Sequence, residues 1–203
     1  MQDRIAVIDF ETTGMSPAQN ARPTEIGVAI IEGGRIVERY QSLMNAGAWI
    51  PPFIEQLTGI SNAMVRSAPP VAKVMGEVAD FVGSTPLLAH NAAFDSKFWD
   101  AELGLLRRQR SQRSQEFACS LLLARRLLPE APSHKLGNLN RWANLPDTGQ
   151  AHRALADAEM AANLTLLLAS RLRERYGVAE VSHAYLCGLQ KLSAAKVRAL
   201  LKA

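Results

Sequence analysis

The chain has 203 residues, of which 48% are hydrophobic and 21% are charged, and this composition excludes a disordered or fibrous protein. Its formal net charge of +4 is compatible with a polyanionic partner such as nucleic acid, although many proteins are mildly basic. No apolar run reaches the roughly 20 residues needed to span a bilayer. Cys119 and Cys187 lie far apart and the first residues do not resemble a secretory signal, so we expect a cytoplasmic protein with free thiols.

The first part of the sequence predicts a three-stranded antiparallel meander. Ile5–Phe10 is a short, branched apolar run typical of a buried strand, and Glu25–Ile31 predicts a second strand. The Gly33-Gly34 pair can form a tight turn, after which Arg35–Met44 returns as a third strand.

The remainder predicts mostly helices, with two more strands at Pro86–His90 and around Phe117. Apolar spacing, capping residues and prolines predict helices at Pro51–Leu57, Val71–Val82, Ala92–Leu103, Leu121–Leu128, Lys135–Ala143, Arg153–Arg175 and Ala194–Lys202. Phe94, Phe98 and Leu105 are expected on the inner side of their helix. Strands first and interleaved helices afterwards predict an α/β fold, a mixed sheet with helices on both faces.

We expect one catalytic domain over residues 1–176 and a helical extension over residues 177–203. A cluster of basic residues precedes and enters the helix predicted at Leu121–Leu128. It comprises Arg107, Arg108, Arg110, Arg113, Arg125 and Arg126. A solvated surface and a nucleic-acid contact are both compatible with it.

Asp9 and Glu11 lie at the end of the first predicted strand. Side chains alternate across a strand, so both carboxylates point to one face while Phe10 points to the other. Adjacent carboxylates repel each other unless a cation lies between them, and hard ions such as Mg²⁺ or Mn²⁺ prefer carboxylate oxygens. The alternative is an acidic, solvent-facing turn after a core strand.

Two further carboxylates begin predicted helices. Asp95 follows the strand that ends at His90, in a helix that we expect Asn91 to cap; alone, it could simply complement the helix dipole. Asp157 lies about one turn inside the longest helix, and His152 precedes that helix, so the imidazole can reach over the same place. An isolated histidine, however, is more often structural or exposed.

Together these segments resemble the three motifs of the DEDDh 3′–5′ exonucleases. The matching segments are Asp9-x-Glu11-Thr-Thr-Gly14, His90-Asn-Ala-x-Phe-Asp95 and His152-x-Ala-x-x-Asp157. They occur in the family's order over residues 4–172, and a histidine five residues before the last aspartate is typical of the histidine branch. Residues 119–126 are similar to the epsilon-like and exonuclease X-like members, although Ala118-Cys119-Ser120 stands where many relatives have Asp-Thr.

The resemblance implies a ribonuclease H-like fold and a metal-dependent 3′–5′ exonuclease that releases nucleoside monophosphates from the 3′ ends of nucleic acid, with DNA as the favoured substrate. It also implies that Asp9, Glu11 and Asp157 hold the first of two Mg²⁺ or Mn²⁺ ions. Asp9 would also reach the second ion, Asp95 would support that ion through water, and His152 would be the general base.

The resemblance implies substrate contacts along three loops. The residues are Thr12, Thr13, Gly14, Leu57, Thr58, Ile60, Asn91 and Phe94. Leu57 or Ile60 would stack on the last base, but both could equally be core residues at a helix end. Asn91 and Phe94 could line the site or only fix their loop.

The expected partner is a 3′-terminal nucleic acid strand. In epsilon subunits a C-terminal tail tethers the polymerase, so the extension from Val178 could bind a polymerase or simply fold back on the domain. An RNA-trimming exoribonuclease and a binding module that does not cut are the competing interpretations. The latter would be expected to lose metal-binding acids, all four of which are present here.

Overall fold

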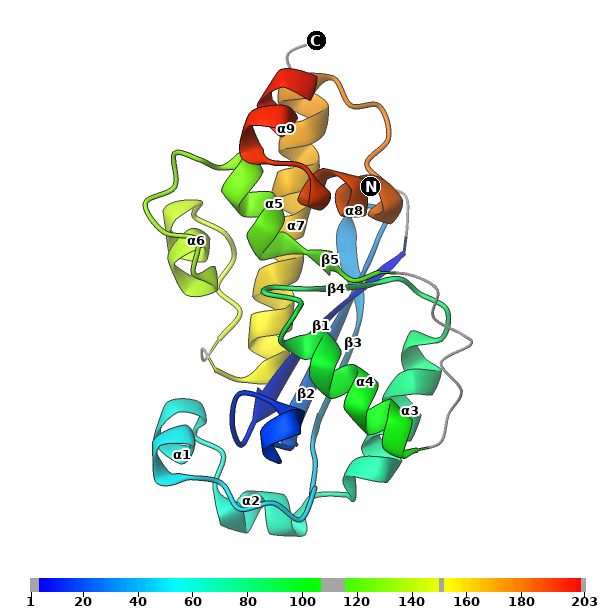
Figure 1. The fold of residues 1–203 in the computed structure, drawn as a ribbon, viewed down its shortest axis with the longest axis vertical. Helices are drawn as coiled ribbons and strands as arrows, with labels where there is room; N and C mark the ends of the chain where they lie inside the picture. The colour runs from blue at the N-terminus through cyan, green and yellow to red at the C-terminus, as the bar shows by residue number, and fades with distance from the viewer. Residues whose placement is uncertain (1–3, 107–115, 150–151, 202–203) are drawn as a thin grey trace.

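The computed structural model describes residues 4–106, 116–149 and 152–201. A five-stranded mixed sheet runs through the centre in the order β3-β2-β1-β4-β5 (Figure 1). The strands are β1 (Ile5–Thr12), β2 (Pro23–Glu32), β3 (Arg35–Leu43), β4 (Leu87–Ala89) and β5 (Ala118–Cys119). The predicted antiparallel meander is confirmed, and β4 pairs in parallel with both β1 and β5.

The helices follow the predicted order, with additions. They are η1 (Pro17–Gln19, a 3-10 turn), α1 (Pro52–Thr58), α2 (Asn62–Ser67), α3 (Val71–Val82), α4 (Asp95–Leu105), α5 (Ser120–Leu127), α6 (Leu136–Trp142), α7 (Ala154–Tyr176), α8 (His183–Lys191) and α9 (Ala194–Leu200). The sequence did not predict η1, α2 or α8. Among the described residues, no helix is long and apolar enough to cross a membrane.

Alternation along β1 divides the core into two layers. Ile5 and Val7 pack with α5, α7 and the last two helices, whereas Ala6, Ile8 and Phe10 pack with α3 and α4. The sheet therefore carries helices on both faces, as the sequence predicted (Figure 1). The odd-numbered positions of β1 face α7, so the strand directs its terminal carboxylates toward the start of that helix.

Gly27 allows α7 to begin directly against β2. A Cβ built on Gly27 would lie 2.2 Å from the carbonyl carbon of Ala154 and 2.2 Å from the nitrogen of Leu155, a distance that no side chain can occupy. The glycine therefore fixes how closely the first turn of the long helix approaches the sheet.

The C-terminal extension folds back on the domain. Val181, Leu186 and Val197 belong to the same buried cluster as α5 and α7. On β5, the backbone nitrogen of Cys119 donates to Oε1 of Gln190 at 2.7 Å, and Nε2 of Gln190 donates to the carbonyl of Phe117 at 3.0 Å. The side-chain amide of Gln190 thus forms the kind of hydrogen bonds with the backbone of β5 that a further strand would form at this edge.

Two local expectations differ from the structure. Asn91 does not cap a helix: it adopts a φ of 66°, and α4 begins only at Asp95, after a turn closed by a hydrogen bond from the nitrogen of Phe94 to the carbonyl of Asn91. Leu105 is not on the inner side of that helix, because it lies in the last turn and is 67% exposed.

Two other expectations concern the cysteines and the basic cluster. Cys119 and Cys187 are free, as the sequence predicted, and both are buried. Of the basic cluster, residues 107–113 lie outside the described residues, whereas Arg125 and Arg126 lie in the last turn of α5.

Candidate active site

Asp9 and Glu11 project from the end of β1 toward the start of α7. Phe10, between them, is buried in the opposite layer, so the predicted alternation holds at the strand end. In the pairing of β1 with β2, Glu11 lies opposite Glu25. The sheet therefore brings a third carboxylate next to the two predicted ones.

Asp95 reaches the same place from the other side of β1. It is only 1% exposed, and its Oδ1 accepts a hydrogen bond from the backbone nitrogen of Phe10 at 3.1 Å. Because β4 runs parallel to β1, the loop after β4 arrives at the same edge of the sheet as the end of β1. The bond to Phe10 then fixes the first residue of α4 beside the strand position that separates Asp9 from Glu11.

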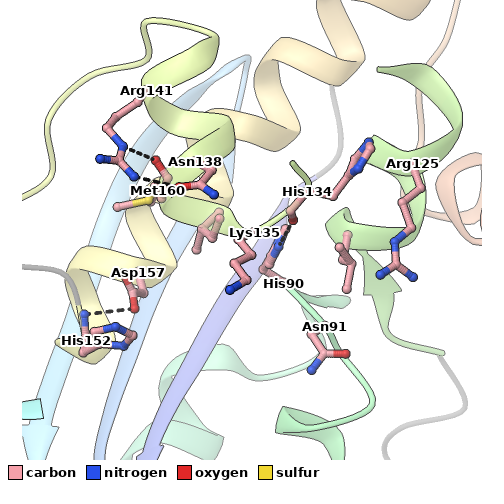
Figure 2. A pocket seen from close by; sticks show the side chains of 13 residues that line it. His90, Asn91, Arg125, His134, Lys135, Asn138, Arg141, His152, Asp157 and Met160 are labelled. Atoms are coloured by element: carbon pink, nitrogen blue, oxygen red, sulfur yellow. Dashed lines mark hydrogen bonds between the residues drawn. The ribbon is translucent and has the colours of Figure 1, made fainter. Parts of the chain in front are cut away.

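Asp157 and His152 come from the start of α7 and the segment before it. The backbone nitrogen of His152 donates to Oδ2 of Asp157 at 3.2 Å (Figure 2). His152 has a φ of 61°, a left-handed conformation that turns the chain sharply ahead of the helix. Its ring is exposed, while Asp157 is half-buried. Ligand atoms of Glu11, His152 and Asp157 all lie within 4.8 Å of one another.

Glu25 and Arg153 hold this segment in place, a role that sequence patterns did not indicate. Glu25 is buried; its Oε2 accepts from Nε of Arg153 at 3.1 Å and from the nitrogen of Ala154 at 3.0 Å. Its Oε1 accepts from Nη2 of Arg153 at 2.7 Å. Burial raises the pKa of Glu25, but these hydrogen bonds outweigh it and leave the pKa lowered. The ion pair joins β2 to the residue directly after His152.

Electrostatics at the cluster favour a bound cation. Burial, then repulsion from Asp95 and Glu11, raises the pKa of Asp9 well above its usual value. Burial and the charge of Asp157 raise the pKa of Glu11 to about 8, and burial raises the pKa of Asp95 to about 8. Burial also raises the pKa of Asp157. The four carboxyl groups therefore do not ionise readily while they are close together without a cation. A hard divalent ion between them would let all four ionise, and carboxylate oxygens are the ligands that such ions prefer.

The segment after β1 is held by its own hydrogen bonds. Thr12 is buried and donates from Oγ1 to the carbonyl of Gly14 at 2.7 Å. Oγ1 of Thr13 accepts from the nitrogen of Arg22 at 3.0 Å, and the nitrogen of Thr13 donates to the carbonyl of Arg22 at 2.9 Å. Thr13 and Gly14 are half-buried at the edge of the site.

The predicted substrate residues near α1 separate into exposed and buried ones. Leu57 is 51% exposed, whereas Thr58 and Ile60 are buried. Ile60 packs with Ile50 and Val65, and this placement favours the core interpretation for Ile60 and the stacking interpretation for Leu57 alone.

Asn91 and Phe94 lie on the turn before α4. Asn91 is exposed and lines a groove that adjoins the carboxylates (Figure 2). Phe94 is half-buried, with its ring centroid 5.1 Å from that of Phe98. Phe94 can therefore fix the loop and still present an edge to a ligand.

Comparison with known proteins gives a consistent result. A family model described as an exonuclease (RNase T) matches residues 6–165. The chain is 37% identical over 174 residues to the DNA polymerase III PolC-type of Oceanobacillus iheyensis, covering 86% of this chain and 12% of that protein. It is 36% identical to the 3′-5′ exonuclease DinG of Bacillus subtilis, covering 85% and 18%. It is 30% identical to the DNA polymerase III subunit epsilon of Aquifex aeolicus, covering 86% and 84%.

The chain spans only 12% and 18% of the PolC-type and DinG relatives, but most of the epsilon subunit. Among solved structures, exonuclease X in complex with 5′ overhanging duplex DNA has a TM-score of 0.71 at 24% identity, covering 92% of this chain and 99% of that one. The nuclease domain of 3′hExo, a DEDDh family member bound to rAMP, has a TM-score of 0.70 at 20% identity, covering 83% and 92%. These likenesses confirm the ribonuclease H-like fold.

Proposed function

The chain belongs to the exonuclease family, and from this membership we propose that it removes nucleoside monophosphates from the 3′ end of nucleic acid, DNA in preference to RNA. The observation that carries the proposal is the cluster of Glu11, His152 and Asp157 within 4.8 Å, with the buried Asp95 bonded to the same strand end. The preference for DNA rests on the relatives, which are named as DNA polymerase III proteins.

The carboxylates would hold the metal ions. Asp9, Glu11 and Asp157 would bind one ion, and Asp9 and Asp95 would bind or support a second, so the donor set suits two Mg²⁺ or Mn²⁺ ions. Ions held there supply charge neutralisation for the phosphate, activation of a water molecule and stabilisation of the leaving 3′ oxygen. The raised pKa values of Glu11 and Asp95, both about 8, support this assignment because a cation would let both carboxyls ionise.

His152 would take the proton from the attacking water. Its ring is exposed to solvent and lies close to Glu11 and Asp157, so a water molecule can reach both the imidazole and the carboxylates. Imidazole is the side chain most often used as a general base near neutral pH. The hydrogen bond from the nitrogen of His152 to Asp157 keeps the base and the carboxylate in a fixed relation.

The 3′-terminal nucleotide would bind beside the end of β1. Thr12, Thr13 and Gly14 provide a rigid loop for its sugar, and the exposed Leu57 on α1 provides a surface for its base. Thr58 and Ile60 would support Leu57 from the core, and Asn91 and Phe94 would complete the opposite wall. Stacking and backbone contacts of this kind tolerate any base. A polymerase is the protein partner to test first, given the names of the relatives.

The direct experiment compares 5′-labelled single-stranded DNA, duplex DNA and RNA of one sequence, with Mg²⁺, with Mn²⁺ and with EDTA. A ladder that shortens from the 3′ end with either metal and disappears in EDTA is expected, with the Asp9→Asn variant as the inactive control. Absence of cleavage of every substrate with both metals would contradict the proposed function. Faster cleavage of RNA than of DNA would contradict the proposed preference for DNA.

A further inference from the structure

A basic groove of about 840 Å³ continues from the carboxylate cluster. His152 and Asp157 line one end, and Arg125, Lys135 and Arg141 line the remainder, contributed by α5 and α6 and the turn before α6 (Figure 2). The groove is of the size that binds small molecules in other proteins, so it has room for more than metal ions.

The cations of the groove have no carboxylate partners among the described residues. Asp157 is the one acid in its described lining, and Arg125, Lys135 and Arg141 form no ion pair within residues 4–106, 116–149 and 152–201. By contrast, Arg22, Arg153 and Arg171 are each paired with a glutamate. Three cations that no described acid neutralises produce a positive potential in the groove, which favours a polyanion.

The floor of the groove is firmly built. His90 is half-buried, and its Nε2 donates to the carbonyl of His134 at 3.1 Å while its Nδ1 accepts from Oγ of Ser120 at 3.0 Å. Burial lowers the pKa of His90 to about 4, so the ring is neutral and structural. Nε2 of His134 in turn donates to the carbonyl of Leu128 at 3.1 Å. These bonds fix the turn that carries Lys135.

Arg141 is also held toward the groove. Its Nη2 donates to Oδ1 of Asn138 at 2.6 Å, and its Nε donates to the carbonyl of Gly137 at 3.3 Å (Figure 2). A guanidinium has five N–H donors, so others remain to meet a phosphate, which arginine can bind through two hydrogen bonds.

The cations of the groove and Leu57 on α1, proposed to stack on the last base, lie on different sides of the start of α7. The start of α7, which carries Asp157, lies between α1 on one side and α6 on the other (Figure 1). A strand whose last nucleotide rests beside α1, with its last phosphodiester at the carboxylates, would therefore continue toward α6.

We propose that this groove binds the backbone phosphates on the 5′ side of the bond that is cut, through Arg125, Lys135 and Arg141. The inference rests on the proposed function and specifies its substrate: a strand of several nucleotides rather than a dinucleotide. Phosphate contacts position a strand without reading its sequence, so the preference is one of length and not of base.

The kinetic test compares two substrates of one enzyme. Thymidine 5′-(p-nitrophenyl phosphate) carries only the terminal nucleotide, whereas single-stranded octathymidylate extends into the groove. For the Lys135→Ala/Arg141→Ala variant, we expect the ratio of kcat/KM on the octamer to kcat/KM on the ester to fall about tenfold, since each exposed charge contact contributes a factor of up to roughly five. The Lys196→Ala/Arg198→Ala variant, which removes the same charge from α9, should keep the wild-type ratio. An unchanged ratio in the groove variant would overturn the proposal.

A binding test separates this inference from the proposed function. In EDTA, where no cleavage occurs, the affinity for fluorescein-labelled octathymidylate is measured by anisotropy over a range of NaCl concentrations. For a single-stranded nucleic acid, removal of one phosphate-binding cation makes the slope of the logarithm of the binding constant against the logarithm of the salt concentration shallower by about 0.7. The groove variant should therefore show a slope shallower by roughly 1.4, and the α9 variant should keep the wild-type slope. This result would support the groove even if no nuclease activity were found, and equal slopes in all three proteins would overturn it.

Discussion

Removal of divalent ions should make the stability of this protein fall as the pH rises toward 8. The reason is the group of largely buried acids: Glu11 and Asp95 each have a pKa of about 8 in the folded protein, against an ordinary value near 4 in the unfolded chain. A carboxyl whose pKa is raised by folding binds its proton more tightly in the folded state. Its contribution to stability is therefore complete below about pH 4 and is lost between about pH 4 and pH 8.

The size of the effect follows from linkage. Consider an acid that is protonated in the folded state and ionised in the unfolded state. Within that range, each increase of one pH unit lowers the free energy of unfolding by about 1.4 kcal/mol for every such acid. Glu11 and Asp95 alone therefore lower the unfolding free energy by roughly 2–3 kcal/mol between about pH 6 and pH 7, and the raised pKa values of Asp9 and Asp157 act in the same direction. For a chain of this size 1 kcal/mol corresponds to roughly 2–4 °C, so Tm in EDTA should fall by roughly 4–12 °C over that unit.

The measurement is a series of thermal unfolding curves at about pH 6, 6.5 and 7, in EDTA and in millimolar Mg²⁺. Mg²⁺ should raise Tm more at the higher pH, because ionised carboxylates bind it better. In EDTA, Asp95→Asn should make the pH dependence shallower by about 1.4 kcal/mol per pH unit, which is the contribution of this one carboxyl. A Tm in EDTA that is independent of pH, or a pH dependence that survives Asp95→Asn in full, would refute the reasoning.

Three further changes give distinct outcomes. His152→Ala should lower kcat by roughly 10²–10⁴ while the KM for DNA stays within a few-fold; unchanged turnover in saturating Mg²⁺ would remove the general-base assignment. Glu25→Gln should destabilise the protein by roughly 3 kcal/mol, because it removes the charge that neutralises Arg153. The same variant should also have a lower kcat. Urea unfolding curves and initial rates measure the two effects, and a wild-type kcat would show that the ion pair is structural only. Truncation after Tyr176 should cost several kcal/mol by removing Val181, Leu186 and Gln190 from β5 and the core; equal midpoints of urea unfolding for the truncated and full chains would contradict this.

The predicted acids were found in one place because their positions follow from local rules. Alternation in β1 places Asp9 and Glu11 on one face, and a strand parallel to β1 delivers Asp95 to the same edge. His152 and Asp157 needed only the start of a helix with a strong apolar pattern. These features depend on sequence neighbours within about one helical turn or on two adjacent strands.

Features set by distant contacts could not be predicted in the same way. Glu25 looked like an ordinary strand residue, since its partner Arg153 is 128 positions away. Ile60 and Leu57 have similar side chains, and only the packing of Ile60 against Ile50 and Val65 separates them. The turn at Asn91 was mistaken for a helix cap because asparagine favours both a cap and a positive φ.

The protection of β5 by α8 also has a consequence for biosynthesis. Cys119 is bonded to Gln190, 71 residues later, so the outer edge of the sheet is without its cover until that residue has left the ribosome. At about 5–20 residues per second, the delay is roughly 4–14 seconds. During this interval the uncovered edge of β5 can pair with a strand of another chain, which leads to aggregation. Slow translation between these two positions should therefore reduce the yield of folded protein more than slow translation before β5.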